Sequence, residues 1–327
     1  MTVWVVGTSA SIDRNGWFSE ISGRTAEEPV VNLSIGNQTS IMGLMRVYSV
    51  REKIQEGDIV VWEYTLLDVL LEDFYGLDLV LQARTVAWNE INDAGASILN
   101  LIIPPRHHLQ QPNHAETRLN AAADEVGVRS LNVRNLFSDL KIDDPADHYR
   151  DDRHPKASSP IVKTIANAVL QAISEIRDQK SGADFRRIEP RTHWTWLSAA
   201  KLSSRKTVTI ENSLTSIDVA KFAPDQPAFM LPCTGRVVAI GVASEVSSGS
   251  IWCGHRGCPP ASVKLEEGAT YPFLLRSTRL PCVRGKVDRL KAAPAWAYGN
   301  GVWADYGQTI CQDERNVRVF GMILEDN

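Results

Sequence analysis

The sequence predicts an α/β domain with a parallel sheet, followed by a mainly antiparallel β domain. From Met1 to about Lys180, short apolar runs alternate with segments of helical periodicity. Strands separated by helices need crossover connections, and such connections produce a parallel sheet that is covered on both faces. Beyond residue 191 the helical pattern disappears, and strand-like runs are separated by clusters of Gly, Pro, Ser and Asn. A length of 327 residues also suits two domains better than one.

The first domain is expected to contain five strands with helices between them. The apolar runs that predict the strands lie at residues 3–6, 29–34, 59–64, 96–103 and 128–133. Helical spacing is found at residues 39–55, at 66–94 with a break near Gly76, at 113–127, and at 155–179. The last of these segments is amphipathic and is expected to close the domain, with Ile161, Ile165 and Val169 on its apolar face.

A linker at residues 181–191 is expected to separate a domain at 1–180 from a β domain at 192–327. Strand-like runs at 207–210, 236–240, 262–265 and 317–320 favour a β-sandwich or jelly roll for the second domain. Five of the nine tryptophans also lie there, at 194, 196, 252, 296 and 303. Such side chains either form platforms for sugar rings or fill cores through their large buried area.

Composition argues against several classes of partner. A net charge of −4 gives no footprint for nucleic acid or for an anionic membrane surface. No apolar run approaches the length of a membrane span. A basic region followed by an apolar stretch and a cleavage site is missing near Met1, so a cytoplasmic location is expected.

The five cysteines all lie in the last third of the chain. An odd number of cysteines in a chain without an export signal indicates reduced thiols. Cys253, His255 and Cys258 are close enough to suggest zinc. Tight zinc sites usually have shorter paired spacings and need a fourth ligand, and there is no second clear pair. No metal is therefore expected.

A candidate nucleophile follows the first strand. Gly7 stops that strand, and Thr8, Ser9, Ala10 and Ser11 come directly after it. In an open parallel sheet, ligands bind at the carboxyl ends of the strands, so Ser9 is the candidate. The alternative is that these residues only form a turn and cap a helix, as Ser and Thr often do.

A candidate base lies just before the closing helix. Pro155 suits the first position of a helix, which would place His154 at the mouth of that helix. Asp151, three residues earlier, can accept a hydrogen bond from the Nδ1–H of His154 and leave Nε2 free to act on a serine hydroxyl. Alternatively, Asp151 and Asp152 are a solvated acidic run beside a capping histidine.

Four segments in this order resemble the sequence blocks of the SGNH (GDSL-type) hydrolase superfamily. Gly7-Thr8-Ser9 resembles the first block, Gly-Asp-Ser. Residues 32–39 resemble the second block, and residues 58–68 align without gaps with the third, which ends in Gly-x-Asn-Asp. The last block, Asp-x-x-His-Pro, is intact at residues 151–155. The resemblance covers roughly residues 1 to 178.

This resemblance implies a flavodoxin-like three-layer fold in which Ser9, His154 and Asp151 form a catalytic triad that needs no cofactor. One position departs from the family pattern. The third-block Asn, which supplies a side-chain amide to the oxyanion hole of relatives, is Leu67 here. The backbone N–H groups of Ser9 and of Gly36 or Asn37 remain as donors. The side chain of Asn37, or of Gln38 at a substrate-binding position, is the candidate replacement for the missing amide.

Two functions follow from this reading. The first is a serine esterase or O-acyltransferase that acts on an acylated carbohydrate, in the first place an acetylated one, or on a related small ester. The second is a catalytically weak or inactive SGNH-fold protein that binds or assembles in glycan metabolism. The three reactive residues favour the first function, and Leu67 favours the second. A glycan or small-molecule ester is the expected partner, without nucleic acid or membrane, and the oligomeric state is open.

Overall fold

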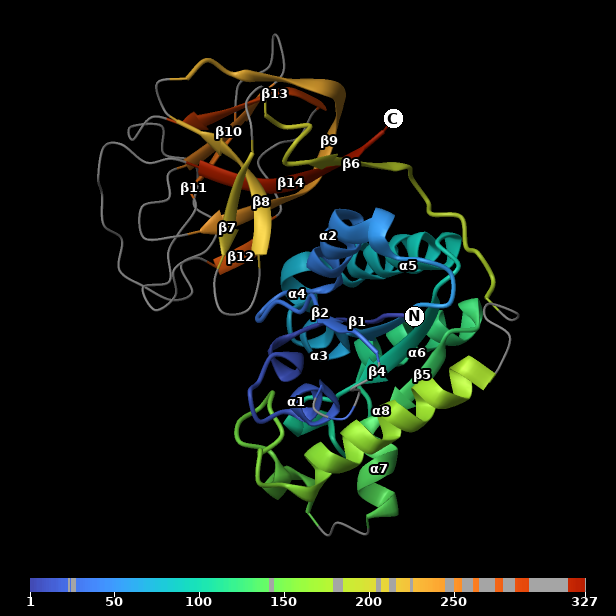
Figure 1. Cartoon of the computed structure of the whole chain (residues 1–327). Helices are drawn as coiled ribbons and strands as arrows, with labels where there is room; N and C mark the ends of the chain where they lie inside the picture. Colours follow the sequence, from blue (N-terminus) through green and yellow to red (C-terminus); the bar gives the residue numbers. More distant parts are fainter. Residues whose placement is uncertain are drawn as a thin grey trace. The chain divides into compact units, whose positions relative to one another are not determined.

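The computed structural model describes residues 1–22, 24, 28–140, 144–178, 185–203, 207–211, 216–223, 226–244, 250–254, 261–264, 274–278, 286–293 and 317–326. The chain divides into two compact units, Met1–Pro190 and Arg191–Asn327 (Figure 1). The division falls at the end of the expected linker, of which residues 181–184 lie outside the described part. Within that part, none of the helices combines the length and apolar character that crossing a bilayer requires.

The first unit is built on a sheet of five parallel strands in the order β2-β1-β3-β4-β5. The strands are β1 (Val3–Gly7), β2 (Val30–Asn32), β3 (Ile59–Glu63), β4 (Ser97–Ile102) and β5 (Arg129–Asn132). This is the flavodoxin-like strand order, and it confirms the predicted parallel α/β fold.

The connections contain eight α-helices and four 3₁₀ helices among the described residues. The α-helices are α1 (Trp17–Ser22), α2 (Ser40–Val50), α3 (Thr65–Leu70), α4 (Glu72–Tyr75), α5 (Leu77–Asp93), α6 (His114–Val126), α7 (Val133–Asp139) and α8 (Pro160–Asp178). The 3₁₀ helices are η1 (Ser9–Ser11), η2 (Arg51–Lys53), η3 (Arg106–His108) and η4 (Pro145–His148). The expected break near Gly76 is present between α4 and α5, where the glycine has φ 80. The sequence did not predict α1 and α7, which are too short to show a helical period.

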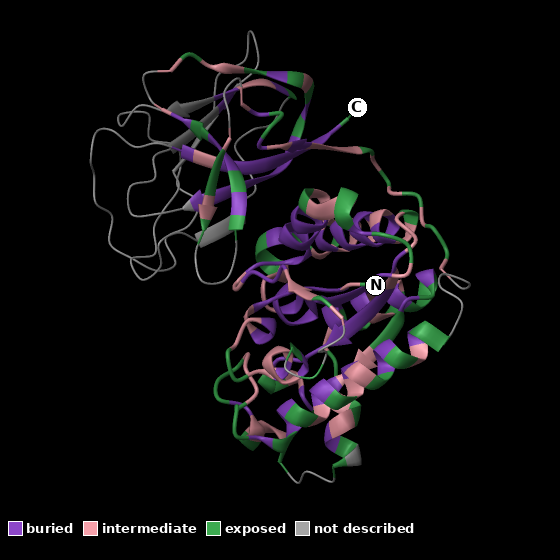
Figure 2. Ribbon diagram, viewed as in Figure 1, coloured by how far each residue is buried: buried purple, intermediate pink, exposed green. Residues whose placement is uncertain are grey.

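The sheet lies between two layers of helices (Figure 1). Val3 and Val5 of β1 face a core that α1, α3 and α8 complete. Trp4 and Val6 alternate with them and therefore face the opposite layer, where α2 contacts both α5 and β1. The central strands β1, β3 and β4 are buried between these layers, whereas the edge strands β2 and β5 are more exposed (Figure 2).

The closing helix begins at Pro160, so the expected start at Pro155 is wrong. Pro155 forms a β-bridge with Tyr149, and the backbone N–H groups of Arg150 and Lys156 donate to the carbonyls of His154 and His148. This pairing holds residue 155 in extended backbone. The Ser159 hydroxyl accepts from the N–H of Ile161 at 3.2 Å, so the capping occurs there and Pro160 occupies the first helical position. His154 therefore lies in a loop, not at the mouth of the last helix.

The second unit is an antiparallel sheet, which confirms the predicted class of the C-terminal domain. Its described strands are β6 (Trp194–Ser198), β7 (Val208–Glu211), β8 (Ser216–Phe222), β9 (Phe229–Ser244), β10 (Ser250–Gly254), β11 (Ala261–Lys264), β12 (Leu274–Thr278), β13 (Lys286–Ala293) and β14 (Val317–Glu325). They follow the order β11-β10-β13-β9-β14-β8-β7, with β12 on β9 and β6 on β14. The sandwich or jelly-roll assignment stays a prediction, because many of the connections lie outside the described residues.

One of the tryptophans in this unit packs on its own sheet. The Trp196 ring covers Gly321 of β14 so closely that a Cβ at residue 321 would lie 1.9 Å from the ring, and the ring also contacts Phe320. Trp196 is thus a packing residue. Trp296 and Trp303 lie outside the described residues.

Candidate active site

The turn after β1 presents Ser9 at the carboxyl edge of the sheet. Thr8 is the N-cap of η1, and its hydroxyl oxygen accepts a hydrogen bond from the N–H of Ala10 at 3.3 Å. Thr8 and Ser11 are buried, whereas Ser9 between them is half-buried. Because Thr8 performs the capping, the hydroxyl of Ser9 is available for other partners.

A buried carboxylate, that of Glu63, holds this turn from beneath. Glu63 ends β3 and lies opposite Gly7 in the parallel register. Its Oε2 accepts hydrogen bonds from the Thr8 N–H at 3.0 Å, the Thr8 hydroxyl at 2.9 Å and the Ser11 hydroxyl at 2.9 Å. A Cβ on Gly7 would lie 2.8 Å from the Ser11 hydroxyl oxygen and 2.9 Å from the Glu63 Cβ, so this close packing needs glycine.

Burial determines how Glu63 ionises. The side chain is fully buried, and its desolvation raises the pKa from 4.5 to about 7, although the hydrogen bonds from Thr8 and Ser11 act in the opposite direction. Sequence reasoning placed this residue in the third strand and gave it no role. The available signal was an acidic residue at the carboxyl end of an otherwise apolar buried strand.

The structure brings Ser9, His154 and Asp151 together in one hydrogen-bonded chain. The Ser9 Oγ lies 2.7 Å from the His154 Nε2. The His154 Nδ1 lies 2.9 Å from each carboxylate oxygen of Asp151. A carboxylate at Nδ1 favours the tautomer in which Nε2 can accept the serine proton. This arrangement has the connectivity of a serine nucleophile with its general base and an orienting acid.

Asp151 is also held by its own loop. The backbone N–H groups of Arg153 and His154 donate to its Oδ1 at 2.8 and 2.9 Å. Partial burial raises the pKa of the Asp151 carboxyl, but the hydrogen bonds from Arg153 and His154 outweigh it and keep the pKa below its usual range. The carboxylate is therefore ionised whenever His154 needs it as an acceptor.

Further contacts attach the loop that carries His154 to other segments at the carboxyl edge of the sheet. The Arg106 N–H donates to the carbonyl of Asp152 at 2.9 Å, and the buried Tyr149 hydroxyl donates to the carbonyl of Pro104 at 2.8 Å. On the outside, the Arg150 guanidinium lies 3.1 Å from the Asp13 carboxylate. Loops after β1, β4 and β5 thus meet around Ser9.

The expected oxyanion segment also lies beside Ser9. A Cβ built on Gly36 would be 3.5 Å from the Ser9 Cβ. Among the described residues, the backbone N–H groups of Ser9 and of both Gly36 and Asn37 donate no hydrogen bond. All three are therefore available for a negative oxygen at this position. Asn37 follows with a left-handed φ of 56.

Gln38 and the start of α2 hold this segment in place. The Gln38 side chain is 5% exposed, and its Nε2 donates to the backbone carbonyl of Asn37 at 2.8 Å. Asp68 accepts from the Ser40 N–H at 2.7 Å and from the Ser40 hydroxyl at 2.5 Å. Asp68 is in turn paired with Arg84 at 2.8 Å, and both side chains are buried. Burial raises the pKa of Asp68, an effect that the Arg84 charge opposes.

Leu67 provides no donor to the site. Its side chain is fully buried in the apolar cluster that also contains Ala10, Trp17 and Tyr149. At this position, where relatives are expected to carry an amide, the chain has core packing instead.

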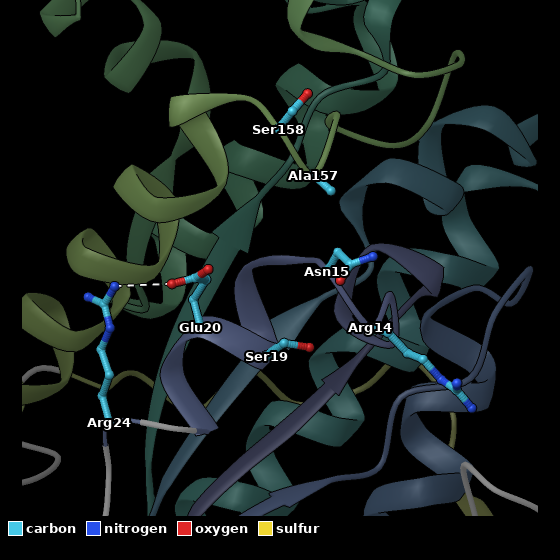
Figure 3. Close-up of a pocket in the computed structure, with 7 residues that line it drawn as sticks. All are labelled: Arg14, Asn15, Ser19, Glu20, Arg24, Ala157 and Ser158. Atoms are coloured by element: carbon cyan, nitrogen blue, oxygen red, sulfur yellow. Dashed lines mark hydrogen bonds and ion pairs between the residues drawn. The ribbon is translucent and has the colours of Figure 1, made fainter.

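A polar hollow of about 580 Å³ lies between the α1 region and the segment that follows His154. Figure 3 shows its lining side chains, which come from α1 with the turn before it and from the segment just after His154. They are Arg14, Asn15, Ser19, Glu20, Arg24, Ala157 and Ser158. Arg24 and Glu20 form an ion pair at 3.1 Å across one side of it.

The zinc alternative falls mostly outside the described residues. Cys253 is buried in β10, but His255 and Cys258 are not described. In the described part of the chain, no group of three His, Cys, Asp or Glu side chains is arranged to hold a metal ion.

No protein-family model matches this chain, and no curated protein matches it in sequence. Among solved structures, it is similar to a two-domain esterase (CEX) active on acetylated mannans. The form co-crystallized with mannopentaose gives a TM-score of 0.61 at 10% identity, covering 99% of this chain and 90% of that chain. A second structure of that esterase gives a TM-score of 0.60 at 11% identity, with coverages of 99% and 91%.

At this level of identity the likeness establishes a shared fold. The N-terminal unit has the parallel flavodoxin-like fold that the resemblance of its sequence blocks to SGNH (GDSL-type) hydrolases implied. The likeness extends over both units, so the chain has the fold of a two-domain esterase of this kind.

Proposed function

We propose that this chain is a serine esterase that removes acyl groups, in the first place acetyl groups, from carbohydrate esters. The observation that carries the proposal is the hydrogen-bonded chain from the Ser9 Oγ through both ring nitrogens of His154 to Asp151. Packing alone does not require a half-buried serine, a histidine and a carboxylate in this connectivity.

The geometry supports a two-step acyl transfer. His154 Nε2 takes the proton of Ser9 as Oγ attacks the ester carbonyl carbon, and Asp151 stabilises the resulting imidazolium. The carbonyl oxygen becomes an oxyanion beside the N–H groups of Ser9 and Gly36. When the carbon–oxygen bond to the leaving alcohol breaks, His154 gives its proton to that alcohol and an acyl-Ser9 remains. Water, deprotonated by His154, then releases the carboxylic acid and restores Ser9.

The substrate class is supported by the two-domain likeness and by the polar hollow. The similar esterase is described as active on acetylated mannans. Here, the hollow beside the segment after His154 offers amide, hydroxyl and charged groups that suit sugar hydroxyls. A sugar hydroxyl in place of water as the second acceptor would make the same site an O-acyltransferase. This reaction remains the alternative outcome of the test.

The test compares full-length wild type, Ser9→Ala and His154→Ala on an aryl acetate and on acetylated manno-oligosaccharides. Loss of either residue should lower kcat by about 10⁴-fold or more, because the two act as one unit. Ser22→Ala, an exposed serine on α1, is the matched control and should keep wild-type rates. A serine-reactive phosphonate should modify the peptide that contains Ser9.

Wild-type rates in Ser9→Ala would end the proposal. If the wild type acts on none of these esters and is not labelled, the chain is instead an inactive SGNH-fold binding or assembly protein. Transfer of acetyl to an added oligosaccharide faster than to water would make it an acyltransferase.

A further inference from the structure

One side-chain contact links the oxyanion segment to the loop of the base. The Arg153 Nη1 donates a hydrogen bond to the Oδ1 of Asn37 at 3.1 Å, across 116 positions of sequence. Arg153 precedes His154, whose Nε2 is 2.7 Å from the Ser9 Oγ. Asn37 follows Gly36, which lies against Ser9. The contact therefore joins the two segments that both lie against Ser9, the one with Gly36 and the one with His154.

The chemistry of this contact fixes which way the Asn37 amide faces. A guanidinium only donates hydrogen bonds, so the atom of the carboxamide that meets Arg153 must be the oxygen. The amide Nδ2, with its two hydrogens, is then on the other branch of the carboxamide. Among the described residues, it has no hydrogen-bond partner.

Gln38, the other candidate for this role, is already engaged. Its Nε2 donates to the backbone carbonyl of Asn37 at 2.8 Å, and its side chain is almost wholly buried. A donor that is already paired has to break that bond before it can serve an oxyanion. Of the two amides considered from the sequence, Asn37 is therefore the better placed.

The backbone of Asn37 is held in a conformation that few residues adopt. Its φ of 56 is left-handed, a region that Asn enters more readily than most residues but still at some cost. The Gln38 amide on its carbonyl and Arg153 on its side chain both restrain it. Strained backbone that is held by its surroundings is typical of functional sites.

We propose that the Nδ2 of Asn37 is the side-chain oxyanion donor that Leu67 cannot supply, and that Arg153 is the positioning residue that fixes its orientation. This proposal rests on the esterase function proposed above. A donor oriented before the reaction loses nothing to reorganisation as charge develops on the substrate oxygen. The Arg153 charge also polarises the amide to which it donates, which makes the Nδ2–H groups stronger donors.

The decisive variants separate the Asn37 amide, which is the proposed donor, from the Arg153 contact that orients it. Asn37→Asp keeps an acceptor for Arg153 but has no N–H to donate, and Asp also tolerates left-handed backbone. Asn37→Gly removes both groups and relieves the φ of 56. Arg153→Ala removes only the group that orients the Asn37 amide, and Arg153→Lys keeps the charge but replaces the planar guanidinium with a single ammonium nitrogen. Arg118→Ala, at a partly exposed residue paired with Asp78, is the matched control.

The measurement is kcat and KM on an aryl acetate, with melting temperature for each variant. Asn37→Asp and Asn37→Gly should both lose about 10²–10³-fold in kcat, with KM little changed, as expected for one oxyanion donor. Arg153→Ala should lose about tenfold, and Arg153→Lys should recover part of that. In the Asn37→Gly background, which has no side chain for Arg153 to hold, Arg153→Ala should cost nothing more, because the donor it positions is already gone.

Several results would overturn this proposal while leaving the esterase function intact. Wild-type kcat in Asn37→Asp would show that the Nδ2 donates nothing. A full tenfold loss from Arg153→Ala in the Asn37→Gly background would show that Arg153 acts on something else. If wild type is no faster than Ser9→Ala, the esterase function fails, and this proposal fails with it.

Discussion

The turn that carries Ser9 and the loop that carries His154 meet at a hydrogen bond of 2.7 Å, yet their surroundings differ. The turn is anchored by the fully buried Glu63, which accepts three hydrogen bonds away from solvent. The loop has one buried side-chain anchor, the Tyr149 hydroxyl on the Pro104 carbonyl, and is otherwise held by backbone hydrogen bonds and by ion pairs near the surface. The side chain of Asp151 is 49% exposed, and that of its neighbour Arg150 is 53% exposed.

This difference predicts how the two regions respond to change. Buried hydrogen bonds are costly to leave unmade and are little affected by salt. Exposed ion pairs contribute less and are screened. Perturbing the turn should therefore affect folding and catalysis together, whereas perturbing the surface of the loop should affect catalysis slightly and folding hardly at all.

The largest effect is expected from removing the anchor of the turn. Glu63→Ala leaves the Thr8 N–H and two hydroxyls without their buried acceptor, so the free energy of unfolding should fall by about 3–5 kcal/mol. Turnover per folded molecule should fall as well, because Ser9 loses its support. Denaturant unfolding and aryl acetate kinetics measure both. Glu63→Gln keeps an acceptor oxygen and should lose less; equal losses in the two variants would contradict the anchoring role.

The same carboxyl should make stability depend on pH. Burial raises the pKa of Glu63 to about 7 in the folded protein, above its value in the unfolded chain, so the folded state holds the proton more tightly. Its contribution to stability is then fully present only below pH 4.5 and is lost as the pH rises from 4.5 through about 7. The buried groups that contribute to its electrostatic surroundings are Asp68, Tyr64 and Tyr149.

Comparison with Glu63→Gln isolates this contribution, since every other titrating group is shared. The stability of wild type relative to Glu63→Gln should increase by up to about 3 kcal/mol as the pH is lowered from 7.5 to 4.5. Denaturant unfolding at several pH values measures it. A difference that stays flat, or that shrinks on acidification, would mean that Glu63 is already ionised at low pH.

Two glycines near Ser9 allow an effect on folding to be separated from an effect on catalysis. Gly7→Ala would place a Cβ within 2.9 Å of Ser11 and Glu63, so something must move, at a cost of about 1–3 kcal/mol. Gly36→Ala would meet only ordinary contacts at 3.4–3.5 Å and should fold with little loss. Its methyl group would instead crowd the oxyanion position and lower kcat. Melting temperatures and kinetics of the pair check this, and the reverse order of stabilities would contradict it.

The sequence predicted the sheet well because its strands are buried apolar runs such as Ile59–Trp62, which leave little choice of structure. It misplaced the start of the closing helix, because a proline suits both a first helical position and extended backbone. Only the pairing of Tyr149 with Pro155 decides between these. The short helices α1 and α7 gave no period to detect.

The candidate site also contains some contacts that the sequence predicts and others that it does not. Asp151 and His154 are three residues apart, so their pairing could be expected from local spacing. Ser9 lies 145 positions from His154; its place after the first strand made it the candidate nucleophile, and the family resemblance implied that the three form a triad. The role of Glu63 depends on the register of β1 against β3, and the contact between Arg153 and Asn37 depends on the whole fold. No local sequence pattern predicts the role of Glu63 or the contact between Arg153 and Asn37.

A smaller effect is expected from restoring the amide that relatives carry. An asparagine at residue 67 would match the family pattern, but Leu67 is fully buried among apolar side chains. The new amide should cost about 1–3 kcal/mol of stability. It should add no turnover if Asn37 already supplies the donor. A faster Leu67→Asn enzyme would show that the oxyanion site extends to α3.

The smallest effect is expected from Arg150→Ala on the outside of the His154 loop. The Arg150 Nε lies 3.5 Å from the Asp151 Oδ2, and the other contacts of that carboxylate, from His154 and from two backbone N–H groups, do not need the arginine. Stability should therefore fall by less than about 1 kcal/mol, and kcat should fall only a few-fold at low salt. At about 1 M salt the remaining difference should vanish, because the Debye length shrinks to about 3 Å. Glu63→Ala should keep its full effect at the same salt concentration. If Arg150→Ala instead costs as much as Glu63→Ala, or keeps its effect in salt, the loop is anchored as firmly as the turn.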